Sequence, residues 1–94
     1  MKIINWNTEK SSALKESRGI CFEDVVFYIE RGDILDDYQH PNQQTYPGQR
    51  IMVICVDNYA YLVPYVEDKE ELFLKTIIPS RKATQKYLGD EHED

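Results

Sequence analysis

The sequence has few of the residues from which small proteins build metal centres and disulfide frameworks. Its 94 residues include two cysteines and two histidines, and their spacing follows no common pattern of metal ligands. Cys21 and Cys55 could pair in principle, but nothing in their context requires a bond. Cys55 lies in an apolar run and is interpreted as a buried thiol. We therefore expect neither a metal nor an organic cofactor.

Long apolar runs are missing as well. No stretch reaches the length of a membrane span, and no segment resembles a signal peptide. We therefore expect a cytoplasmic protein that does not associate with membranes. No linker, low-complexity segment or internal repeat interrupts the chain, and its length suits one modest core. A single domain is expected over residues 1–89.

Positive charge is scarce in the chain as a whole. Eleven lysines and arginines stand against 17 acids, which gives a net charge of −6. Residues 90–94 hold four of the acids, and this acidic tail is expected to be disordered. Proteins that bind nucleic acids are more often basic. The charge therefore argues against binding along an extended duplex, but it permits a small local phosphate site.

A hydrophobic fraction of 41% with seven tyrosines indicates a folded chain. Residues 3–6 are a short strand candidate. A first helix is expected to begin after an N-cap at Asn7 or Thr8 and to run through Arg18, because Gly19 is a typical C-terminal stop.

A second helix is predicted from Phe22 to Arg31, where apolar residues recur at spacings of three and four. Gly32 ends it. A strand is expected to begin at Ile34-Leu35, before a polar segment over residues 36–49.

The clearest strand signal is the apolar run 51–56, which is typical of a central strand covered on both faces. Asp57-Asn58 is a candidate for a two-residue hairpin turn. Consecutive antiparallel strands are therefore predicted over residues 50–56, 59–66 and 72–78, with an edge or a bulge at Pro64. The predicted fold class is α+β, an antiparallel meander sheet with its helices packed on one face.

The last element combines a helix start with positive charge. Ser80 is a good N-cap, so Arg81 and Lys82 fall in the first helical turn, where free backbone N–H groups favour an anion. Lys75 and Lys86 add two more cations, and no acid lies between residues 75 and 87. We predict a phosphate site at residues 81–83. The alternative is a short terminal helix with an ordinary solvated face.

His40 in the polar segment, two arginines and a tyrosine would together suit RNA cleavage if the fold brings them to one site. His40 can accept the 2′-hydroxyl proton near neutral pH, while Arg50 and Arg81 can hold the phosphate. Tyr87 can stack on a base or position a phosphate. Whether Arg50 and Arg81 share a site depends on the path of the loop 36–49 and on the twist of the sheet.

Four stretches of the chain resemble the BrnT-type toxins of type II toxin–antitoxin systems. They are INWNTEK at residues 4–10, RGICFEDV at 18–25, the stretch 40–50, and IIPSRKAT at 77–84. The resemblance spans residues 3–88. It implies a RelE-like fold, with two N-terminal helices, an antiparallel sheet and a short C-terminal helix.

The resemblance also implies a function and its residues. The function is metal-independent endoribonuclease cleavage of RNA, which a cognate antitoxin neutralises. The resemblance is compatible with two assemblies, a homodimer and a toxin–antitoxin hetero-oligomer. The functional residues carried over by position are His40, Arg50, Arg81, Lys82 and Thr84, with Tyr87 as a further candidate.

Two other functions remain open on the sequence. One is a catalytically degenerate toxin-like protein that keeps a partner-binding surface, as the negative charge of the chain permits. The other is a small α+β module that binds a nucleotide or another ligand in the anion site.

Overall fold

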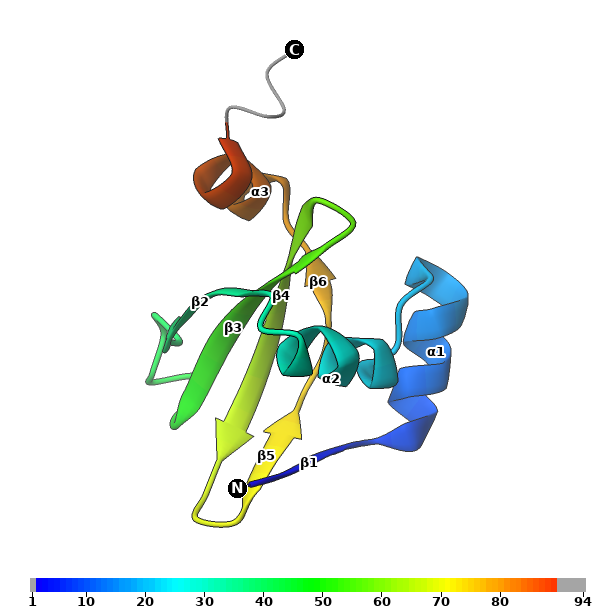
Figure 1. The fold of residues 1–94 in the computed structure, drawn as a ribbon. Coiled ribbons are helices and arrows are strands. Elements are labelled where there is room, and N and C mark those ends of the chain that lie inside the picture. Colours follow the sequence, from blue (N-terminus) through cyan, green and yellow to red (C-terminus); the bar gives the residue numbers. More distant parts are fainter. Residues whose placement is uncertain (1, 90–94) are drawn as a thin grey trace.

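The computed structural model describes residues 2–89, in which three helices and six strands form an α+β fold (Figure 1). The strands are β1 (Ile3–Trp6), β2 (Ile34–Gln39), β3 (Gln49–Val56), β4 (Tyr59–Glu67), β5 (Glu71–Leu74) and β6 (Ile78–Pro79), and the helices are α1 (Thr8–Arg18), α2 (Phe22–Glu30) and α3 (Arg81–Leu88). The predicted acidic tail, residues 90–94, lies outside the described residues. Among residues 2–89, no helix is long and apolar enough to cross a membrane.

Short polar side chains and one glycine set the bounds of α1. The Asn7 side chain accepts a hydrogen bond from the backbone N–H of Lys10 at 2.9 Å. Gly19 ends the helix in the left-handed conformation, with φ of +75°, which costs glycine little. The predicted helix is confirmed at both ends.

The second helix is capped by an acid instead of by its N-cap side chain. Asp24 reaches back and accepts the backbone N–H of Cys21 at 3.0 Å, as in a capping box. The helix ends at Glu30, one residue before the predicted end, and Arg31 is its C-cap.

The sheet is mixed, with the strand order β1-β5-β4-β3-β2, and β6 pairs with β4. β1 runs parallel to β5 at one edge, whereas the other pairs are antiparallel. The predicted all-antiparallel meander is therefore wrong at this edge. A parallel pair of strands needs a long connection, and here the connection is the segment from the end of β1 to the start of β5, which contains α1, α2 and strands β2 to β4.

The central hairpin confirms the prediction for strands β3 and β4. Asp57 and Asn58 have φ values of +52° and +65°, as a two-residue turn between twisted strands requires. Residues 51–54 of β3 are all buried, which agrees with a strand covered on both faces.

The strand predicted over residues 72–78 is interrupted. β5 ends at Leu74 and β6 begins at Ile78, so three residues face two residues of β4, Val63 and Pro64. The Pro64 carbonyl accepts the N–H of Lys75 at 2.8 Å. Proline has no backbone N–H, so Pro64 cannot donate a second hydrogen bond to this segment. The ladder of hydrogen bonds is interrupted there.

Helices cover both faces of the sheet, so the prediction of helices on one face is wrong. Phe22 of α2 packs in one buried cluster with Met52 and Ile54, whereas Ala83 of α3 packs in another with Val53 (Figure 1). The reason is the apolar run of β3, which presents hydrophobic side chains to both faces and needs cover on each.

Candidate functional site

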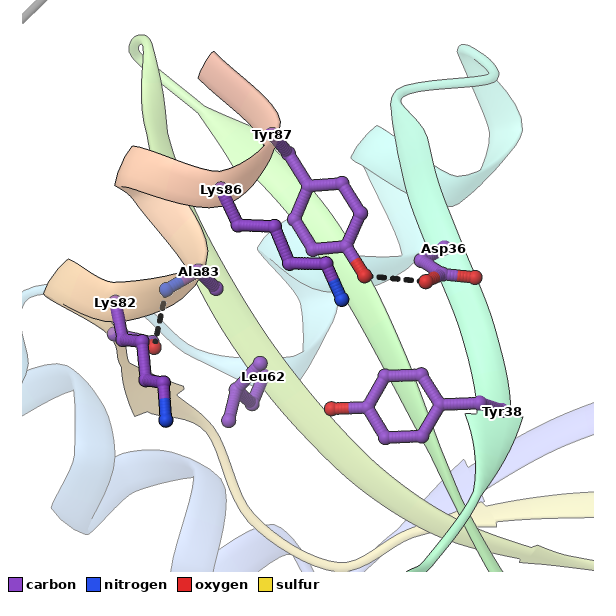
Figure 2. A pocket seen from close by; sticks show the side chains of 8 residues that line it. Asp36, Tyr38, Leu62, Lys82, Ala83, Lys86 and Tyr87 are labelled. Carbon is purple, nitrogen blue, oxygen red and sulfur yellow. Dashed lines mark hydrogen bonds between the residues drawn. The ribbon is translucent and has the colours of Figure 1, made fainter. Parts of the chain in front are cut away.

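A cleft lies between α3 and β2, on the face of the sheet that α3 covers (Figure 2). Its volume is about 470 Å³, within the range of small-ligand sites. Its lining residues are Asp36, Tyr38, Leu62, Ser80, Lys82, Ala83, Lys86 and Tyr87.

Ser80 and Thr84 fix the first turn of α3 on the sheet. The Ser80 hydroxyl accepts the N–H of Ala83 at 3.0 Å, and the Thr84 hydroxyl donates to the Ser80 carbonyl at 2.7 Å. The backbone N–H of Ala60 donates to the Thr84 hydroxyl at 2.8 Å. Thr84 is 3% exposed, so the structure places this predicted site residue in the join between α3 and β4.

The same contacts modify the phosphate site predicted at the start of α3. Ser80 occupies the N–H groups of Ala83 and Thr84. The helix start therefore offers an anion the N–H groups of Arg81 and Lys82, together with their side chains.

The helical period places two lysines at the cleft. Lys82 and Lys86 are four residues apart and lie on one side of α3, while Ala83 turns toward the sheet. The Lys82 ammonium lies beside the Leu62 side chain, and the Lys86 ammonium extends toward the Tyr87 hydroxyl and Asp36 (Figure 2). The Lys86 ammonium also lies 5.2 Å from the centre of the Tyr87 ring.

A hydrogen bond joins the two walls of the cleft. The Tyr87 hydroxyl donates to Oδ2 of Asp36 (Figure 2). The backbone N–H of Asp37 donates to Oδ1 of Asp36 at 2.7 Å. The bond from Tyr87, followed by that from Asp37, lowers the pKa of Asp36. The same bond to Asp36 is the main cause that raises the pKa of Tyr87 to about 12. At neutral pH the pair is a carboxylate and a neutral phenol.

Tyr38 extends from β2 into the cleft with its hydroxyl toward α3 (Figure 2). Burial, and then the charge of Asp36, raise the pKa of Tyr38, so its hydroxyl is a hydrogen-bond donor at neutral pH. Sequence reasoning missed Asp36 and Tyr38 because it placed them in a loop. Their spacing of two residues, in a strand that begins at Ile34, was the signal that both share a face.

Arg81 is exposed at the start of α3 but does not line the cleft. Successive residues of a helix are about 100° apart around its axis, and Lys82 takes the position that faces the cleft. Arg81 is therefore a cation beside the cleft.

Arg50 lies on the opposite face of the sheet. Its Nε donates to Asp37 at 3.2 Å and to the Tyr65 hydroxyl at 3.3 Å, and Tyr65 belongs to the core under α1 and α2. Arg50 pairs with Tyr65 near the far end of β4, whereas β6, which leads into α3, pairs with Tyr61 and its neighbour. The structure does not bring Arg50 and Arg81 together.

His40 follows the end of β2 and organises the loop to β3. Its Nδ1 accepts the backbone N–H of Asn42 at 3.0 Å, and its ring lies 4.4 Å from that of Tyr46. In the neutral ring the other nitrogen then carries the proton, so the lone pair that a general base needs is already in use. His40 has no hydrogen bond to α3 among the described residues.

Comparison of the chain with protein-family models, with curated proteins and with solved structures finds no match. Within residues 2–89, no group of three or more His, Cys, Asp or Glu side chains is placed to hold a metal ion.

Proposed function

We propose that this protein is a cytoplasmic endoribonuclease toxin that holds a phosphodiester of single-stranded RNA in the cleft between α3 and β2. The observation that supports the proposal is the convergence of the Lys82 and Lys86 ammonium groups and the Tyr38 hydroxyl on one open cleft. Ammonium and hydroxyl donors suit phosphate oxygens, and tyrosine rings suit unstacked bases.

The chemistry that fits this cleft is metal-independent transesterification. The RNA 2′-hydroxyl loses its proton to water and its oxygen attacks the adjacent phosphorus, while the bond to the 5′-oxygen breaks. The 5′-oxygen takes a proton from water and leaves as a hydroxyl, and a 2′,3′-cyclic phosphate remains. Lys82 and Lys86 neutralise the charge that develops on the phosphate oxygens. Arg81, exposed beside the cleft, binds a flanking phosphate.

In this proposal catalysis comes from positioning and charge stabilisation. The Nδ1 lone pair of His40 is engaged by Asn42, and Arg50 lies on the other face of the sheet with Asp37. We therefore assign the phosphate to Lys82 and Lys86 and not to His40 and Arg50. A cognate antitoxin, as the toxin-like motifs imply, neutralises the protein by covering the cleft.

The test is induced expression in a bacterial host, with growth and RNA integrity followed over time. The wild type should arrest growth and fragment RNA, and the Lys82→Ala/Lys86→Ala variant should do neither. Lys10→Ala/Lys69→Ala is the matched control, because it removes the same charge from α1 and from the β4–β5 loop. Equal RNA fragmentation by wild type and cleft variant would refute the assignment.

The position of Asp36 favours a second candidate, a toxin-like protein without catalysis that serves as an interaction or ligand-binding module. Its carboxylate lies in the same cleft as the two lysines, and the chain carries a net charge of −6, so RNA affinity is reduced. Intact RNA and normal growth under induction, together with binding to an antitoxin encoded by an adjacent gene, would establish this alternative.

A further inference from the structure

The two walls of the cleft differ chemically. Asp36, the acceptor, extends from β2, whereas Lys82 and Lys86 extend from α3, with the Lys86 ammonium toward Asp36 (Figure 2). We propose that this arrangement selects guanine: Asp36 binds the Watson–Crick edge of the base while the lysines bind its phosphate. This inference rests on the proposed function, since it assumes that the cleft receives RNA.

The hydrogen bonds of Asp36 leave room for two further donors. A carboxylate offers about four acceptor positions, two on each oxygen. The Tyr87 hydroxyl uses one position on Oδ2, and the backbone N–H of Asp37 uses one on Oδ1. One acceptor position therefore remains on each oxygen, which equals the number of donors in an adjacent pair.

Only guanine offers such a pair of donors among the four RNA bases. Its N1–H and its N2 amino group lie side by side on the Watson–Crick edge, which single-stranded RNA exposes. Adenine and cytosine present one amino group next to an acceptor nitrogen, and uracil presents one N–H between two carbonyls. A carboxylate repels those acceptors, so the other three bases pair less well with Asp36.

The rest of the cleft suits the remainder of a guanine nucleotide. The rings of Tyr38 and Tyr87 flank Asp36, and Leu62 forms an apolar surface between β2 and α3 (Figure 2). Base–aromatic contact stabilises a bound base. The Tyr38 hydroxyl and the two ammonium groups are then available for the phosphate.

The experiment is titration of the full chain, labelled with nitrogen-15, with GMP, AMP, CMP and UMP at low salt. Amide shifts of residues 36–38 and 80–87 report binding. We expect GMP to bind roughly 5- to 150-fold more tightly than the other nucleotides, the range for one bidentate contact to a base. In Asp36→Asn the preference should disappear, because the amide presents one acceptor and one donor.

Asp68→Asn is the matched control, with the same change of charge in the β4–β5 loop. There Asp68 accepts the N–H groups of Glu70 and Glu71, which an amide oxygen can also accept, so the guanine preference should persist. Equal affinity for all four nucleotides, or a preference unchanged in Asp36→Asn, would overturn the inference while leaving the proposed RNA site in place. No shift with any nucleotide would remove both.

Discussion

Single tyrosine hydroxyl groups connect the strands and helices of this protein on both faces of the sheet. Tyr87 donates to Asp36 on the α3 face, and Tyr65 donates to Asp37 at 2.8 Å on the other. The side chains of Asp36 and Asp37 therefore lie on opposite faces of the sheet, because successive side chains of a strand alternate between the two faces. The first lines the cleft, and the second is an exposed partner of the buried Tyr65.

Tyr65 should make the stability of the protein depend on pH in the alkaline range. Burial, and then its bond to Asp37, raise the pKa of Tyr65 to about 12, against an ordinary value near 10. The unfolded chain therefore loses this proton first, and deprotonation favours unfolding. The contribution of the protonated hydroxyl is complete below about pH 10 and is lost as the pH rises toward 12.

Urea unfolding of the wild type and of Tyr65→Phe at pH 8 to 11.5 checks this expectation. The wild type should be the more stable below pH 10, and the difference in unfolding free energy should shrink above it. A difference that stays constant across the range would contradict the account.

At the scale of elements, α3 is attached to the sheet through its first turn. The Thr84 hydroxyl accepts the N–H of Ala60 in β4 at 2.8 Å, and Ala60 is fully buried. Thr84→Val keeps the shape of the side chain but leaves that N–H without an acceptor, which should destabilise the fold by about 1–3 kcal/mol. Thr84→Ser keeps the hydroxyl. If both variants unfold at the same urea concentration, Thr84 does not have this role.

Local signals in the sequence were sufficient for several of the element boundaries. Asn7, Gly19 and Ser80 act at helix ends as their side chains or backbone freedom predict, and Asp57-Asn58 forms the predicted turn. These features depend on residues that are close together in the chain.

Features that depend on distant residues were not predictable from the sequence. The parallel pairing of β1 with β5 and the position of α3 on the second face involve contacts between residues that are far apart in the chain. β2 was too short in the prediction because Asp36 and Asp37 are poor strand formers. The site was hard to predict for the same reason. Arg50 and Arg81 lie on opposite faces of the sheet, and the sequence alone does not say on which face each arginine lies.

At the scale of the whole molecule, charge should control RNA affinity. Removing residues 90–94 deletes four acids and changes the net charge from −6 to −2. We expect the shortened chain to bind RNA more tightly at low salt, with a gain that decreases as salt rises. Fluorescence anisotropy with a labelled single-stranded RNA over a salt series measures this, and unchanged affinity at low salt would leave the segment a solubilising role.

The central claim is that RNA binds in the cleft between α3 and β2. Titration of the nitrogen-15-labelled full chain with a short single-stranded RNA, at low salt, tests it most directly. We expect amide shifts concentrated at residues 36–38 and 80–87. These shifts should be lost in the Lys82→Ala/Lys86→Ala variant but not in Lys10→Ala/Lys69→Ala. Shifts confined to other parts of the sheet, or none at these residues, would contradict it.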